Sequence, residues 1–290
     1  MLIYYYVPNL ILISLFLGMS IGCVSAYATV RRWSLIGDII SHSSLPGIVY
    51  MFLFSESQNH LILVLGGAIS ALISVLFSFY IKKKTHLPKD SPLALILSLF
   101  FSLGIIGIAI IQKKSIAGQS MINNFIYGNI ITFASGNIYT YMYICIFILL
   151  FFFYTINLQK YVGFDNSFMQ IYYKYTYLYE FIVLLISILT IVIGLQSVGI
   201  LLMGALIIAP GSFAKLFTNS YLNIILLSMI VTFISFLFGV GIGIYYSSIP
   251  TGPIIALIPV SLCILVYIFN KIKNAFLFKK NIQLKLKERK

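Results

Sequence analysis

Two ionisable side chains, Asp38 and His42, stand four residues apart inside an apolar run of the sequence, residues 35–54. In an α-helix this spacing puts both side chains on one face, one turn apart. Counted from Arg32, the carboxyl lies about 9 Å and the imidazole about 15 Å along the helix. If the run crosses a membrane, an ionisable residue at such a depth costs about 2.5–3.5 kcal/mol or more, which indicates a function.

A carboxylate and a neutral imidazole are ligand types for a divalent first-row metal ion. Pro46 removes the helical hydrogen-bond partner of the His42 carbonyl, which favours a helix kink with a wet or ion-lined cavity beside the pair. One helix supplies only two such ligands, so a second copy of the chain would complete a four-ligand site. Two other interpretations stay open: an Asp38–His42 hydrogen bond that only holds the helix, and a proton relay.

The composition places this pair in a membrane protein. Hydrophobic residues make up 61% of the 290 residues and charged residues 9%, against about 45–50% and about 25% in soluble domains. This excludes a soluble domain, a disordered chain and a disulfide scaffold, and it predicts an all-α polytopic bundle. The net charge of +13 does not indicate nucleic-acid binding, because the basic residues lie in short segments between apolar runs.

About nine apolar runs approach or exceed the length of a spanning helix, which is about 20 residues. The seventh run is short, so the count is eight or nine. The segment 112–137 is too polar to span and is expected to be re-entrant or interfacial. We expect one transmembrane domain, 1–270, and a basic cytoplasmic tail, 271–290. The runs cover about residues 8–30, 35–54, 60–81, 92–111, 138–156, 177–195, 198–210, 221–246 and 253–270.

The basic residues predict the orientation, because cytoplasmic loops of membrane proteins are enriched in Lys and Arg. With Arg31 in the cytoplasm, all 19 basic residues except Lys113 and Lys114 fall on that side. The N-terminus is then outside and the C-terminus in the cytoplasm. His60 and Glu180 lie near the ends of runs and are expected to be solvated. The sequence has no GxxxxGK[ST] phosphate loop, so any ATP hydrolysis of that kind belongs to a partner chain.

Two long stretches resemble a known family. Residues 31–47 read RRWSLIGDIISHSSLPG and resemble the first signature of the permeases of ABC-type manganese/zinc/iron importers. Residues 195–218 read LQSVGILLMGALIIAPGSFAKLFT and resemble their second signature. Weaker matches at residues 127–129, 163–168 and 250–253 keep the family's order along nearly the whole chain.

The resemblance implies a fold similar to that of the vitamin B12 and siderophore permeases, in a bacterial cytoplasmic (inner) membrane. It implies a permease homodimer, or a dimer with a close paralogue, together with cytoplasmic ABC ATPase subunits and an extracytoplasmic metal-binding protein. The chain itself would be no enzyme and would hold no tight cofactor, since the metal ion passes transiently. Asp38 and His42 occupy the family's metal-handling positions.

The resemblance also implies that the segment after the seventh run docks on the ATPase. Two departures from the family's pattern stand out. Ser248 replaces a common acid, which weakens the idea of an acidic external ring, and Gly211 replaces a common alanine, which is expected to add flexibility. The coupling segment is expected to comprise Pro210, Gly211, Ser212, Phe213, Ala214, Lys215, Leu216, Phe217 and Thr218.

Other functions remain open at this point. A proton-coupled secondary transporter would use Asp38 as its protonation site, and a siderophore-type permease would carry a metal chelate. A scaffold without transport would leave the buried acid unexplained. The residues do not indicate whether manganese, zinc or iron is transported. The Ser-Leu-Pro-Gly form of the first signature favours manganese or iron, by resemblance. Acid should weaken metal handling, because ligation needs an ionised Asp38 and a neutral His42.

Overall fold

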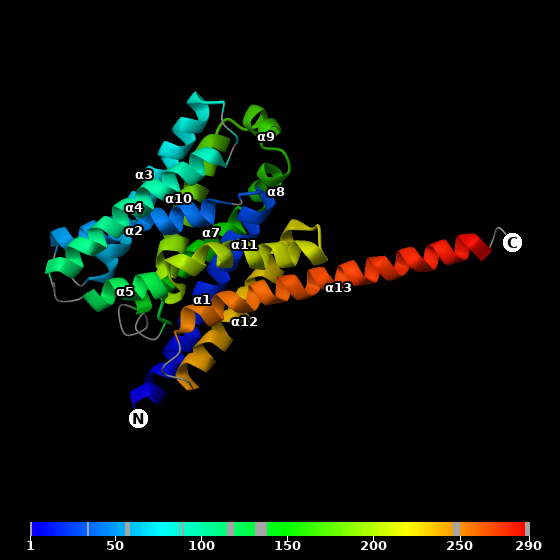
Figure 1. The fold of residues 1–290 in the computed structure, drawn as a ribbon. Helices are drawn as coiled ribbons and strands as arrows, with labels where there is room; N and C mark the ends of the chain where they lie inside the picture. The colour runs from blue at the N-terminus through cyan, green and yellow to red at the C-terminus, as the bar shows by residue number, and fades with distance from the viewer. Residues whose placement is uncertain are drawn as a thin grey trace.

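The chain forms a helical bundle in the computed structural model (Figure 1). The structure describes residues 2–33, 35–55, 59–86, 88, 90–114, 119–130, 138–245 and 250–287. Within these ranges the helices are α1 (Leu2–Val30), α2 (Ile36–Ser55), α3 (His60–Lys84), α4 (Ser91–Lys114), α5 (Gln119–Tyr127), α7 (Ile138–Tyr154), α8 (Ile156–Phe164), α9 (Asn166–Tyr172), α10 (Thr176–Val198), α11 (Ile200–Phe217), α12 (Tyr221–Tyr245) and α13 (Thr251–Lys287).

Eight of the described helices are long and apolar enough to cross a membrane, namely α1, α2, α3, α4, α10, α11, α12 and α13. A ninth crossing would combine α7 and α8, which are bent by 62° at Thr155. The predicted all-α fold with eight or nine spans is therefore confirmed. The uncertain crossing is not the expected one, however, because the short seventh run continues past Pro210 into a helix of 18 residues.

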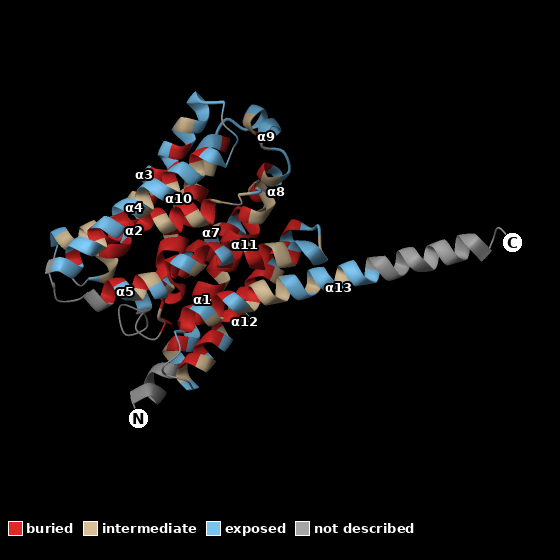
Figure 2. Cartoon of the chain, viewed as in Figure 1, coloured by how far each residue is buried: buried red, intermediate tan, exposed pale blue. Residues whose placement is uncertain are grey.

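The surface of the bundle suits lipid. Within an 18-residue apolar stretch of each span, 72% and 78% of the residues are buried in α1 and α10, whereas only 22% are buried in α4 (within 91–113) and in α13 (within 251–273), as Figure 2 shows. On α3, the exposed side chains include Leu65, Ile69, Ile73 and Leu76, which follow one another at turn spacing. Water would penalise such a continuous apolar stripe, but a hydrocarbon environment does not.

The last helix runs through the predicted domain boundary. The prediction separates a membrane domain, 1–270, from a basic tail, 271–290, yet α13 continues without a break from Thr251 to Lys287. Its second half extends beyond the other helices (Figure 1). The segment 112–137, expected to be re-entrant or interfacial, contains the short helix α5, while residues 131–137 lie outside the described part of the chain.

Several basic segments meet at one end of the bundle. Arg32, at the turn after α1, lines a cavity of about 550 Å³ together with Lys82 of α3. Lys160 of α8 lines a neighbouring cavity with Ser220, from the turn between α11 and α12. The structure thus gathers at one end the segments that the orientation assigns to the cytoplasm. Which end faces the cytoplasm stays a prediction.

The other end is joined by close backbone packing. Asn129 N donates to the carbonyl of Gln196 at 2.9 Å, and Ile130 N donates to Thr251 Oγ1 at 3.1 Å. Gly199 links α10 to α11 with φ +94, a left-handed conformation that favours glycine. A Cβ there would lie 2.6 Å from the carbonyl oxygen of Ile126. This turn therefore fixes where α11 begins.

Candidate metal site

The helix α2 carries the candidate ligands, and the turn before it is anchored to α1. Trp33 N donates to the carbonyl of Ala28 at 2.9 Å. The Trp33 ring packs edge-on against Tyr27 with 5.3 Å between ring centroids, and the Arg31 guanidinium lies 5.8 Å from the Trp33 ring centroid. These contacts set the start of α2, and with it the depth of Asp38.

The helix α2 also approaches α3 closely. The backbones meet where Gly47 faces Gly66, because a Cβ on Gly66 would lie 2.8 Å from the Gly47 carbonyl oxygen. Ser70 Oγ of α3 donates to the carbonyl of Ser43 at 2.6 Å. Pro46 is buried inside α2, which continues to Ser55 as one helix, so the kink expected there stays a prediction.

The Asp38 carboxylate lies against α11. Asp38 is half-buried, and its Oδ1 occupies the position that a Cβ of Gly204 would take. One turn further along α11, a Cβ on Gly37 would lie 3.1 Å from Ile207 Cβ. The two helices are therefore in close contact at the carboxylate and at the neighbouring Gly37, and the carboxylate points towards α11.

His42 faces a different helix. Its half-buried ring packs edge-on against Phe101 of α4, with 5.1 Å between ring centroids and 87° between ring planes. The His42 Nδ1 atom is buried and makes no hydrogen bond to the described residues. This nitrogen therefore does not form the Asp38–His42 hydrogen bond that would only hold the helix. A buried ring nitrogen without a partner calls for a further group or ion.

One chain supplies too few side chains for a complete site. Among the described residues, no group of three or more His, Cys, Asp or Glu side chains could hold a metal ion. The pair that the sequence singles out lies one turn apart on α2. Asp38 points towards α11, and His42 points towards α4. Water, backbone carbonyls or a second protomer must provide any remaining ligands.

The expected coupling segment, Pro210 to Thr218, forms the last turns and the cap of α11 rather than a separate helix. Gly211 N donates to Ser25 Oγ of α1 at 2.9 Å, and a Cβ on Gly211 would lie 2.5 Å from the Ser25 carbonyl oxygen. Gly211 therefore allows close packing of α11 against α1, and the flexibility expected of it stays a prediction. Pro210, Gly211 and Ala214 are buried, Ser212, Phe213 and Thr218 are half-buried, and Lys215, Leu216 and Phe217 are exposed.

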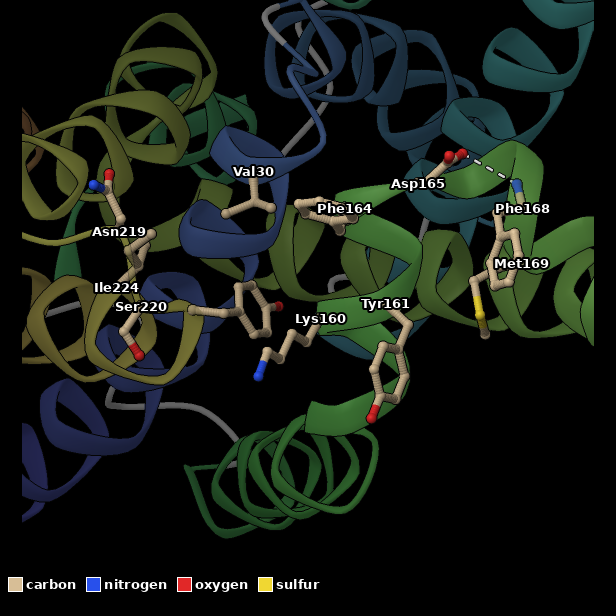
Figure 3. A pocket seen from close by; sticks show the side chains of 12 residues that line it. Val30, Lys160, Tyr161, Phe164, Asp165, Phe168, Met169, Asn219, Ser220 and Ile224 are labelled. Carbon is tan, nitrogen blue, oxygen red and sulfur yellow. Dashed lines mark hydrogen bonds between the residues drawn. The ribbon is translucent and has the colours of Figure 1, made fainter.

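A cavity of about 700 Å³ opens beside the end of α11, between α8, α9 and the turn into α12 (Figure 3). Asp165 is the N-cap residue of α9, and its Oδ1 accepts a hydrogen bond from Phe168 N at 3.1 Å. Phe164 is 96% exposed and Phe168 is 61% exposed. The cavity is therefore lined by exposed aromatic side chains of α8 and α9 and by the turn that follows α11.

Sequence reasoning missed two polar contacts. Glu180 is not simply solvated, as expected, but forms an ion pair with Arg31, and the two side chains are only 18% and 13% exposed. Arg31 Nη1 also donates to the Val162 carbonyl at 2.9 Å. His60 Nδ1 lies 3.1 Å from Gln196 Nε2. Separations of 149 and 136 residues leave no local signal for these pairs. Ser248, the other departure from the family's pattern, lies outside the described residues.

A bundle of lipid-facing helices with two ionisable side chains inside one span is the construction of a multi-pass membrane transport protein. The match to a known family makes this specific. Residues 3–270 match the ABC 3 transport family, and the chain belongs to this family. It is the membrane permease of an ABC-type transporter and not the ATPase.

The relatives carry transport names. The chain is 31% identical to the zinc transport system membrane protein TroC of Treponema pallidum, over 88% of this chain and 85% of the relative. It is 26% identical to the manganese transport system membrane protein MntC of Listeria monocytogenes, over 96% of this chain and 95% of the relative. Other relatives are named as membrane proteins of iron transport systems.

A solved structure has the same fold. The chain superimposes on PsaBC from Streptococcus pneumoniae, solved in complex with Fab, with a TM-score of 0.77 and 24% identity. The match covers 90% of this chain and 91% of that chain. The bundle described here is therefore a known permease fold.

Proposed function

We propose that the chain is the permease subunit of a binding-protein-dependent importer for manganese, zinc or iron ions. The relatives named for zinc, manganese and iron transport support this range of metals. One structural observation carries the proposal. A carboxylate and an imidazole stand one turn apart within a spanning helix, and the buried imidazole nitrogen has no hydrogen-bond partner in the described chain.

The ion is held transiently by Asp38 and His42 of two protomers. Two carboxylates balance the charge of a divalent cation, and two neutral imidazoles suit first-row metals. A homodimer supplies this set from a single type of chain. Few ligands per protomer keep binding weak enough for release, as conduction requires. The chain holds no tight cofactor, and the metal ion is its cargo.

The orientation follows from the charges at the two ends of the bundle. Because basic residues favour the cytoplasmic side, the end with Arg32, Lys82 and Lys160 faces the cytoplasm. The N-terminus is then outside and the tail after residue 270 is cytoplasmic. The binding protein approaches the opposite end, where Gln196 and Thr251 lie, and the ATPases approach the basic end.

The ATPase contact uses the end of α11 and its neighbours. Pro210, Gly211 and Ala214 are buried, so they cannot touch a partner unless α11 leaves α1. The exposed turn at Lys215 to Phe217 can do so directly. Phe164 and Phe168, both exposed, line the cavity in Figure 3, and Asn219 and Ser220 from the turn after α11 line the same cavity. A partner that docks here would contact both parts.

The test is metal accumulation in cells that depend on this transporter. We expect Asp38→Asn and His42→Ala to lower accumulation of the transported metal at least 10-fold, because each removes a ligand type from both protomers. The matched controls are Asp90→Asn and His86→Ala, both at exposed positions outside the spans, which should leave accumulation unchanged.

Membrane insertion and recovery of the ATPase by affinity capture should be normal in all four variants. Normal accumulation in Asp38→Asn and His42→Ala would remove the metal-site proposal. Uptake by energised vesicles without nucleotide would instead favour a proton-coupled carrier that uses Asp38. Preference for a metal chelate over the free ion would indicate a chelate permease.

A further inference from the structure

The glycine at position 204 stands out in α11. It is buried in the middle of a helix, where glycine weakens helix formation relative to alanine. The position that its Cβ would take is filled by Asp38 Oδ1, with Asp38 Cγ 2.7 Å and Oδ2 3.5 Å from the same point. The carboxylate of one helix thus occupies the space of the missing side chain on another.

We infer that Gly204 is a positioning residue for the Asp38 carboxylate: it leaves open, on α11, the place where that carboxylate must lie to meet the metal ion. The inference rests on the proposed function, because the role of the carboxylate in metal handling is part of that proposal. The geometric part of the inference does not depend on the proposed function, since it concerns only which side chain fills the space at Gly204.

The surrounding contacts prevent the two helices from making room. Gly37 packs against Ile207, and this contact would be lost if α2 moved away from α11 to make room. The helix α11 is fixed at its start by the left-handed Gly199 and near its end by the hydrogen bond from Gly211 to Ser25. A side chain at residue 204 must therefore displace the carboxylate itself.

The displaced carboxylate has few alternatives. An aspartate side chain has two rotatable bonds and a small number of staggered positions, so it turns away from α11 as a whole. Its distance to the His42 ring then changes, while that ring stays packed on Phe101. Ligand geometry must be held within about 0.5 Å for a productive site, so this shift weakens ion binding.

The experiment compares two glycine-to-alanine variants in the complete transporter, using the metal ion that the cells accumulate as the probe. Gly204→Ala should raise the metal concentration for half-maximal uptake at least 10-fold. Gly241→Ala is the matched control, because a Cβ at this glycine of α12 meets nothing within 4 Å. It should change that concentration less than two-fold. Normal half-maximal uptake in Gly204→Ala would overturn the inference.

A second measurement separates positioning from general packing. The melting temperature of the purified transporter is compared for Gly204→Ala, Asp38→Ala and the double variant. Because Asp38→Ala empties the space at residue 204, the added alanine should then lower the melting temperature little, although it lowers it clearly beside Asp38. If Gly204→Ala alone does not fold, recovery of folding in the double variant supports the same conclusion.

An equal loss of melting temperature in both backgrounds, or failure of the double variant to fold, would overturn the inference, because the clash would then be with the backbone of α2. Normal uptake by Asp38→Ala would remove the proposed function instead. The melting temperatures would still decide whether the Asp38 side chain is what fills the space at Gly204.

Discussion

Removing the Glu180 side chain should destabilise the permease, because it leaves the positive charge of Arg31 without its partner. Arg31 pairs with Glu180, donates to the Val162 carbonyl and lies over Trp33, with 13% of its side chain exposed. Breaking a buried ion pair by deleting one partner costs about 3–5 kcal/mol. Because both side chains retain some exposure, we expect about 2–3 kcal/mol for Glu180→Ala, near or below the low end of that range. Glu180→Gln, which keeps a hydrogen-bond acceptor, should cost about half as much.

The measurement is the apparent melting temperature of the detergent-purified protein at one fixed scan rate. A loss of about 2–3 kcal/mol corresponds to about 5–10 °C for a chain of this size. The exposed Asp90→Asn serves as the control and should leave the temperature unchanged. Adding Arg31→Ala to Glu180→Ala should restore part of the loss, because it removes the unpaired charge. A double variant whose loss equals the sum of the single losses would refute this reasoning.

Two further variants test the packing around the site. Gly199→Ala should lower the melting temperature by more than 5 °C, since an alanine there takes a left-handed φ and meets the carbonyl of Ile126; a change as small as that of Gly241→Ala would contradict the backbone contact. Tyr221→Phe removes the buried hydrogen bond to Gln159 Oε1 and should cost about 1–2 kcal/mol in the same assay, and an unchanged melting temperature would show that this bond contributes nothing.

The sequence predicted the spans well because the length of an apolar run is a direct requirement of the bilayer. It also singled out Asp38 and His42, because ionisable residues inside such runs are rare. The end of α11 was misjudged because the seventh run was taken to stop at Pro210. In the structure the helix continues, and groups on neighbouring helices bond to the backbone around Pro210. Ser228 Oγ donates to the Pro210 carbonyl at 3.3 Å, and Ser25 accepts from Gly211.

The remaining features depend on contacts between distant segments. Nothing near Glu180 in the sequence indicates Arg31, and a glycine at position 204 reads as ordinary helix packing until Asp38 is seen beside it. Hydropathy describes one helix at a time, whereas these contacts arise from how pairs of helices are placed. These contacts could be identified only from the three-dimensional structure.

The bend at Thr155 has a consequence for the surrounding bilayer. The helix α7 has 17 residues, which span about 26 Å, less than the hydrocarbon thickness of about 30 Å. Such a mismatch is relieved when the lipid thins locally or when the next segment sinks into the headgroup layer. The exposed Tyr154 and Tyr161 suit that layer. The acyl-chain length of the host membrane should therefore affect how deeply α7 and the segment after it lie in the bilayer.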